Sequence, residues 1–176
     1  MTDAAYGRIT APAEVRFERL LPGPIETVWQ FLVDSDKRGQ WLASGPMELK
    51  EGGAVELRFQ HRDLSPHKVA PPDRYKEMDE KGHVSHERVL RVEPPRLLAI
   101  SWGKSEVTFE LMPEGKNVRL ILTHRQLATR AEMVQTSGGW HTHLDILVER
   151  ANGRVPKAFW TVFGDIEGQY EKRYPK

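Results

Sequence analysis

Apolar residues recur at helical spacing between residues 129 and 153. The stripe alternates steps of four and three residues, the spacing of one helix face laid against a sheet. Thr129 with Glu132 three residues later predicts a capping box at its start, and Asn152-Gly153 predicts its end. We therefore expect one long helix whose buried stripe consists of Met133, Ser137, Trp140, Leu144, Leu147, Val148 and Ala151.

A glycine pair, Gly138-Gly139, lies inside this helical pattern and not at its end. Glycine within a helix costs about 1 kcal/mol relative to alanine. The pair therefore predicts that either another backbone segment or a ligand approaches the helix closely at this turn.

Alternating apolar and polar residues predict strands in most of the remaining chain. The first covers residues 14–19, and two short helices follow it, one that begins at Pro24 and one that carries Trp41. Turn residues at Gly52-Gly53 predict a hairpin over residues 47–61. Tight turns then join four strands into an antiparallel meander over residues 84–92, 97–102, 107–111 and 118–124.

This order of elements is typical of an α+β fold in which a curved antiparallel sheet wraps around a long C-terminal helix, with two short helices after the first strand. We expect a flexible N-terminus over residues 1–12 and one domain over residues 13–153. Residues 63–83 form a long polar insertion, either a lid or a mobile loop, and residues 154–176 form an amphipathic helical extension. One helix leaves part of the concave face uncovered, which predicts a cavity.

Composition excludes several classes of protein. The 26 Lys and Arg residues balance 25 Asp and Glu residues and are interspersed with them, so there is no basic stripe for nucleic acid. No apolar run is long enough for membrane insertion. The absence of cysteine excludes disulfides and thiolate metal sites, and the N-terminus lacks the pattern of a secretory signal, so we expect a cytoplasmic protein.

Three separated segments carry a resemblance to a known family: RLLPGPIETVWQFLVDSDKRGQWLASG, VEPPRLLAISWG and SGGWHTHLDILVERANG. They resemble the homologues of the activator of the ninety-kilodalton heat-shock chaperone ATPase. That family belongs to the START-related, polyketide-cyclase-like superfamily, and the resemblance extends over about residues 15–151. It implies a helix-grip fold.

The resemblance also implies roles for several residues. Trp29, Trp41, the turn Pro94-Pro95-Arg96 and the pair Gly139-Trp140 match recurring features of the family that look architectural. The eukaryotic co-chaperones of the family bind the chaperone through a separate N-terminal domain, for which these 176 residues leave no room. A chaperone partner is therefore an alternative, not the leading expectation.

Polar residues on apolar strand faces are the candidate ligand-binding groups, because burial of a polar group is costly unless it is hydrogen-bonded. In this interpretation Arg88 would hold an acidic headgroup, and a histidine would exchange a proton near neutral pH. The alternative is that these residues lie hydrated at the rim of the sheet. Extended alternation places His61 beside Phe59, His86 and Arg88 beside Leu90, and His124 beside Leu122.

No catalytic or metal-binding motif accompanies these residues. On a helix, His141 shares a face with Asp145, whereas His143 is turned to the other side, so the three cannot bind one metal ion. Glu87 follows His86 but points to the opposite face of its strand, which argues against an acid–base pair. We predict no metal, no cofactor and no catalytic residue, and expect His141 or His143 to flank Trp140.

The sequence thus favours a module that binds a small hydrophobic or amphipathic molecule in an internal cavity. One alternative is a cyclase, dehydratase or hydrolase that uses a cavity histidine, and another is a co-chaperone-like interaction domain. The predicted cavity residues are Phe59, His61, His86, Arg88, Trp102, His124, Trp140 and Leu144.

Overall fold

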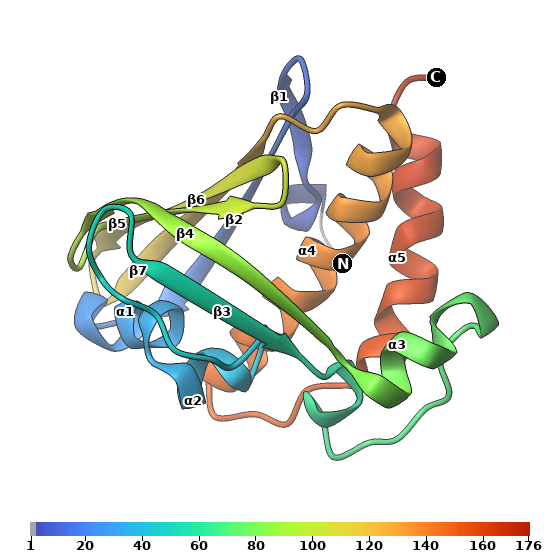
Figure 1. The fold of residues 1–176 in the computed structure, drawn as a ribbon, viewed down its shortest axis with the longest axis horizontal. Helices are drawn as coiled ribbons and strands as arrows, with labels where there is room; N and C mark the ends of the chain where they lie inside the picture. Colours follow the sequence, from blue (N-terminus) through green and yellow to red (C-terminus); the bar gives the residue numbers. More distant parts are fainter. Residues whose placement is uncertain (1–2) are drawn as a thin grey trace.

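A curved sheet of seven antiparallel strands forms one side of the protein (Figure 1). The computed structural model describes residues 3–176. The strand order is β1-β2-β7-β6-β5-β4-β3, so β4 to β7 form the predicted meander, β3 pairs with β4 and β2 pairs with β7. The strands are β1 (Arg8–Ala11), β2 (Glu14–Pro22), β3 (Ala54–Phe59), β4 (His83–Glu93), β5 (Leu97–Trp102), β6 (Ser105–Glu114) and β7 (Asn117–Arg125).

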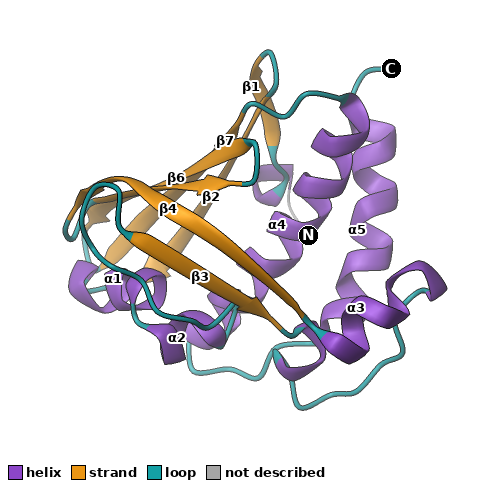
Figure 2. Cartoon of the chain, viewed as in Figure 1, coloured by secondary structure: helices purple, strands orange, loops and turns teal. Residues whose placement is uncertain are grey.

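Helices line the concave side and one end of this sheet (Figure 2). The two short helices predicted after the first long strand are α1 (Ile25–Val33) and α2 (Ser35–Gly39). The sequence predicted that the second helix carries Trp41, but Trp41 follows this helix and is buried. Arg38 is also buried and fixes this corner, since its guanidinium donates to the main-chain carbonyls of Leu32, Val33, Ala43 and Gly45.

The long helix α4 (Arg130–Ala151) lies against the concave face. The Thr129 side chain accepts from the Glu132 backbone N–H, and the Glu132 side chain accepts in return, which confirms the capping box. Arg19 projects inward from β2, and its guanidinium lies 3.3 Å from the Asp145 carboxylate of α4. The predicted α+β helix-grip fold is confirmed.

A second helix, α5 (Phe159–Arg173), runs antiparallel to α4 on the side away from the sheet (Figure 1). A Cβ atom added to Gly138 would lie 3.4 Å from the Cα atom of Glu167 in α5. Gly138 therefore allows two helix backbones to approach each other, which is one of the two alternatives that the sequence left open for the glycine pair. Phe159, Phe163, Ile166 and Tyr170 of α5 are buried as its amphipathic pattern requires.

The N-terminal segment contacts the C-terminal helix. The Gly7 backbone N–H donates to the Tyr170 hydroxyl over 2.7 Å, and Tyr170 is 0% exposed. Residues 3–5 form a 3₁₀ turn and β1 pairs with β2, in the segment for which the sequence predicted no element. The prediction for residues 1 and 2 lies outside the described residues.

Two local predictions differ from the structure. Residues 47–61 do not form a regular hairpin: only isolated bridges join Ser44 to Arg58 and Met47 to Val55, and the main partner of β3 is β4. The insertion 63–83 is not wholly irregular, because it contains a 3₁₀ turn (Asp73–Tyr75) and the short helix α3 (Lys76–Lys81). Within residues 3–176, no helix is long and apolar enough to cross a membrane.

Candidate functional site

An open pocket of about 470 Å³ lies between α4 and the strands β3, β4 and β5, beside α3. Gly139 forms part of its wall, and a Cβ atom added there would have no atom within 4 Å. The second glycine of the pair therefore faces open space, whereas Gly138 faces α5. The lining residues are Leu42, Phe59, His61, Met78, His83, Ser85, Glu87, Trp102, Gly103, Gln135, Thr136, Gly139, Trp140 and His143.

Aromatic rings form the apolar wall of this pocket. The Trp102 and Trp140 ring centroids are 4.9 Å apart, and Phe59 meets Trp102 edge-on at 5.8 Å. The structure thus brings together four of the predicted cavity residues, Phe59, His61, Trp102 and Trp140. Leu144 is fully buried in the core and does not line the pocket.

His124 lies beneath the pocket and is 0% exposed. The Trp140 indole N–H donates to His124 Nδ1 over 2.9 Å, so Nδ1 carries no proton. The proton is then on Nε2, which donates to Ser105 Oγ over 2.7 Å, and Ser105 donates to the Trp102 carbonyl. Burial lowers the pKa of His124 to about 4. His124 is therefore a neutral structural group that orients Trp140. The prediction that it lines the cavity is wrong.

Two further imidazoles face each other at the pocket, with the His61 and His143 ring centroids 5.2 Å apart. His143 Nδ1 lies 2.7 Å from the Trp41 carbonyl and must donate to it, which leaves Nε2 as an acceptor. Burial and the neighbouring His61 lower the pKa of His143 to about 3. Burial and the nearby His83 lower the pKa of His61 to about 4. Both rings are neutral at pH 7.

His86 and Arg88 lie exposed on the outer face of the sheet, so the predicted inward orientation is wrong. The cause is a bulge in β4: Val89 pairs with Ile100 but Arg91 pairs with Ala99, which leaves Leu90 as an extra residue. A one-residue insertion moves every side chain before it to the other face. Alternation extended backward from Val92 therefore assigned His86 and Arg88 to the wrong side.

The same bulge turns Glu87 into the pocket, where the sequence did not place it. The Glu87 carboxylate accepts from Ser101 Oγ over 2.6 Å and from the Gly103 backbone N–H over 3.0 Å. These bonds hold it where β4 and β5 separate, beyond the last pair Val89–Ile100. The sequence did predict that Glu87 and His86 lie on opposite faces of the strand. Because His86 was assigned to the wrong face, Glu87 was as well.

His141 and His143 lie on different sides of α4, as predicted from their spacing. His141 Nδ1 is 2.8 Å from the Tyr170 hydroxyl, and its Nε2 is 3.5 Å from Asp145, on the side of α5 and the N-terminal segment. His143 is the histidine that flanks Trp140, at a centroid distance of 6.5 Å. Among residues 3–176, no three His, Cys, Asp or Glu side chains are grouped to hold a metal ion.

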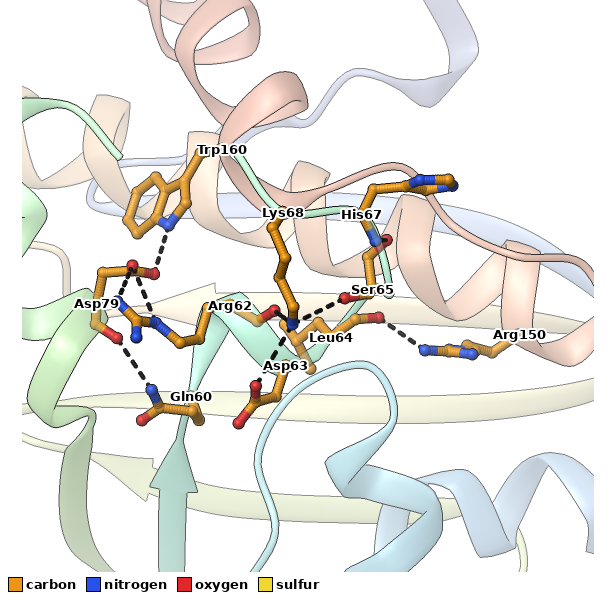
Figure 3. Close-up of polar contacts among 10 residues, drawn as sticks. All are labelled: Gln60, Arg62, Asp63, Leu64, Ser65, His67, Lys68, Asp79, Arg150 and Trp160. Atoms are coloured by element: carbon orange, nitrogen blue, oxygen red, sulfur yellow. Dashed lines mark hydrogen bonds and ion pairs between the residues drawn. The ribbon is translucent and has the colours of Figure 1, made fainter. Parts of the chain in front are cut away.

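The helix α3 beside the pocket is anchored by a buried carboxylate (Figure 3). Asp79 is 3% exposed and accepts from Trp160 Nε1 over 2.7 Å and from Arg62 over 2.9 Å. The Gln60 side chain donates to the Asp79 carbonyl. The 3₁₀ turn His61–Asp63 is held by Arg150, which donates to the Leu64 carbonyl. A second pocket of about 500 Å³ lies on the other side of His61, between this turn, α3 and the start of α5.

Replacement of Asp79 by Asn should loosen α3. It removes the ion pair with Arg62, and an amide has one acceptor oxygen in place of the two carboxylate oxygens that bind Arg62 and Trp160. We expect a loss of about 1–3 kcal/mol in the stability of this segment. Hydrogen exchange of the amides of residues 76–82 should accelerate more than that of β6 and β7. The matched variant Glu80→Gln, at an exposed neighbour, should exchange like the wild type; equal protection of α3 in both variants would show that Asp79 does not anchor it.

Comparison with known proteins adds to this geometry. A family model described as "Activator of Hsp90 ATPase homolog 1-like protein" matches residues 22–152. The solution structure of a protein from Bordetella parapertussis is 45% identical, with a TM-score of 0.81, and the match covers 96% of this chain and 90% of that chain. No curated protein matches this chain significantly.

More distant structures share the fold. The crystal structure of CalU16 from Micromonospora echinospora is 23% identical with a TM-score of 0.64, over 95% of this chain and 93% of that chain. A conserved protein of unknown function from Enterococcus faecalis is 17% identical with a TM-score of 0.66, over 95% and 88% of the two chains.

Proposed function

Because the chain belongs to the family of Activator of Hsp90 ATPase homologue 1-like proteins, we propose that it is a binding module for a small hydrophobic or amphipathic molecule. The observation that carries this proposal is the pocket between α4 and strands β3 to β5. Its volume of about 470 Å³ lies within the range of small-molecule sites, and aromatic side chains with a few polar groups form its wall.

The position of Gly139 supports the proposal independently. A glycine in the middle of a 22-residue helix weakens that helix, and the side of Gly139 away from the backbone is open. No neighbouring backbone requires glycine at this position, in contrast to Gly138. A ligand that occupies the space beside the helix accounts for the missing side chain.

The insertion 63–83 is the proposed lid. Met78 of α3 lines the pocket, while Asp79 on the same helix is bonded to Trp160 and Arg62. Movement of α3 would uncover the pocket at the cost of these bonds. The lid would thus hold one wall of the pocket at rest and would widen the pocket through movement of α3.

An enzyme is the second candidate, favoured by one observation: His61 lies near a second polar group, His143, at the pocket. General bases act best when their pKa lies near the working pH. The pKa values of about 4 and about 3 make both histidines weak bases at pH 7. Binding is therefore the function that the pocket supports better.

Filling the space beside Gly139 tests the proposal. The variant Gly139→Leu should keep or raise the free energy of unfolding, because leucine favours helix over glycine by up to about 1 kcal/mol. It should weaken binding of N-phenyl-1-naphthylamine, a neutral aromatic probe read by its fluorescence, at least about tenfold, or about 1.4 kcal/mol.

Two variants serve as controls for this experiment. Gly164→Leu places the same side chain at an exposed glycine of α5 with nothing within 4 Å, and should leave probe binding unchanged. Arg88→Met should also have no effect, because Arg88 lies on the outer face. Probe binding that survives in Gly139→Leu, or that is absent from the wild type, would refute this pocket as the binding site.

A further inference from the structure

The pocket is lined by a carboxylate and by neither lysine nor arginine. Among the described residues that line it, the one carboxylate belongs to Glu87. The second pocket differs in this respect, since Arg62, Lys68 and Lys76 all line it. The absence of cations is therefore a property of this pocket and not of the whole end of the molecule.

Glu87 is held in place without being neutralised. Its two donors, Ser101 Oγ and the Gly103 N–H, are uncharged, and within residues 3–176 no lysine, arginine or histidine forms an ion pair with it. A carboxylate has acceptor sites for about four hydrogen bonds, so the donors from Ser101 and Gly103 leave capacity for a ligand. A pre-oriented carboxylate at a pocket wall fits a group that donates hydrogen bonds and carries positive charge.

The aromatic wall also favours a positively charged ligand. Phe59 and Trp140 both lie within 6 Å of Trp102, measured between ring centroids, and all three line the pocket. A cation placed over such a ring face is attracted by its quadrupole, and tryptophan attracts it most strongly. A carboxylate in the same place would lose hydration without a cation to compensate.

We propose that this pocket takes an apolar, aromatic-sized molecule that carries an amine, with the ammonium group beside Glu87 and the hydrocarbon body against Trp102 and Trp140, and that it discriminates against carboxylic acids. The proposal rests on the binding function argued above and specifies its ligand class. It reverses the expectation of an acidic headgroup held by Arg88, because the bulge in β4 exchanges Arg88 for Glu87 at the wall.

Three compounds with one ring system test the charge preference: 1-naphthylmethylamine, 1-naphthalenemethanol and 1-naphthoic acid. Titrations of the wild-type protein at pH 7.5, followed by amide chemical shifts of residues around Trp102 and Gly139, give their dissociation constants. We expect the amine to bind at least tenfold more tightly than the acid, with the alcohol between them. An acid that binds as well as the amine, including equal failure of both, overturns the proposal.

Two variants test the role of Glu87 in opposite directions. Glu87→Gln should reduce the affinity for the amine to that for the alcohol, while Glu26→Gln, at an exposed position in α1, should leave the series unchanged. Ser85→Lys introduces a cation at the wall and should reverse the preference toward the acid, so the proposal is tested even if Glu87→Gln does not fold. An unaltered preference in folded Glu87→Gln or Ser85→Lys would also overturn it.

Failure of this proposal is distinguishable from failure of the binding function. If the acid binds at the pocket and the amine does not, the pocket is a ligand site with the opposite charge preference. If neither the naphthalene compounds nor N-phenyl-1-naphthylamine shift the resonances of the pocket residues, the binding function itself is wrong.

Discussion

Acidification from pH 7 to pH 5 is expected to remove most of the stability of this protein. Burial lowers the pKa of four histidines: His61 and His124 to about 4, and His141 and His143 to about 3. In the unfolded chain these histidines take up protons near pH 6.5, so between pH 6.5 and 4 the unfolded state binds more protons than the folded state. Stability is therefore present above pH 6.5 and is lost as the pH falls.

The expected size of this effect is large. Each histidine removes up to about 1.4 kcal/mol of stability for each pH unit below 6.5, so the four together remove roughly 5 kcal/mol per unit. Typical domains have only about 5–15 kcal/mol in total. Asp145 acts in the opposite direction, because burial raises its pKa, but it is one group against four.

Tryptophan fluorescence and circular dichroism as functions of pH measure this transition, which we expect between about pH 5.5 and 4. His61→Phe should make the loss of stability less steep by about a quarter, since it removes one of the four titrations and no hydrogen bond of the His61 ring within the described chain. His86→Gln, on the outer face, should follow the wild type. A native signal that persists unchanged to pH 3.5 would contradict this predicted loss of stability.

Replacement of Trp140 by Ala is expected to cost about 3–5 kcal/mol of the free energy of unfolding, the usual cost of emptying a large aromatic site in a core. Trp140 is 3% exposed, and its ring contacts Trp102 and Phe109 at centroid distances of 4.9 and 5.8 Å. The variant also leaves His124 Nδ1 without its donor, which adds the cost of an unsatisfied buried group.

Chemical denaturation measures this loss, and two further variants separate its causes. Trp140→Phe keeps most of the ring but removes the bond to His124, so its cost should reflect mainly that bond, about 1–3 kcal/mol. Leu90→Ala, at an exposed apolar residue of β4, should change stability by less than about 0.5 kcal/mol. A denaturation midpoint in Trp140→Ala close to that of Leu90→Ala would contradict the buried position of the indole.

Periodicity was sufficient to predict the elements that have one buried face. The strands from β4 to β7 and the helix α4 follow directly from spacing, and the capping box marks the start of α4 at the correct residue. Spacing did not reveal that α4 is also buried outside its apolar stripe, because His141, Thr142 and His143 are polar. His141 and His143 are satisfied by partners distant in sequence, and the Thr142 hydroxyl donates to the Gly138 carbonyl one turn earlier.

The site was harder to predict than the fold. The bulge at Leu90 cannot be predicted from the sequence, because Val89, Leu90 and Arg91 each fit either face of a strand. This bulge decides whether Arg88 or Glu87 faces the pocket. Helix α3 has six residues, too few for a periodic signal, and it depends on Asp79 and its bonds to Arg62 and Trp160. Both the bulge and α3 depend on contacts with segments distant in sequence, which a local pattern of residues does not reveal.

The bond between the Gly7 backbone and the Tyr170 hydroxyl constrains the order in which the molecule is completed during synthesis. These residues are 163 positions apart, and β2, which follows Gly7, pairs with β7 across about a hundred residues of chain. Contacts of such high sequence separation slow folding, because a long loop must close before they form. During synthesis β2 can pair with β1, but its other edge lacks a partner until β7 has emerged, and the bond from Gly7 to Tyr170 waits for α5.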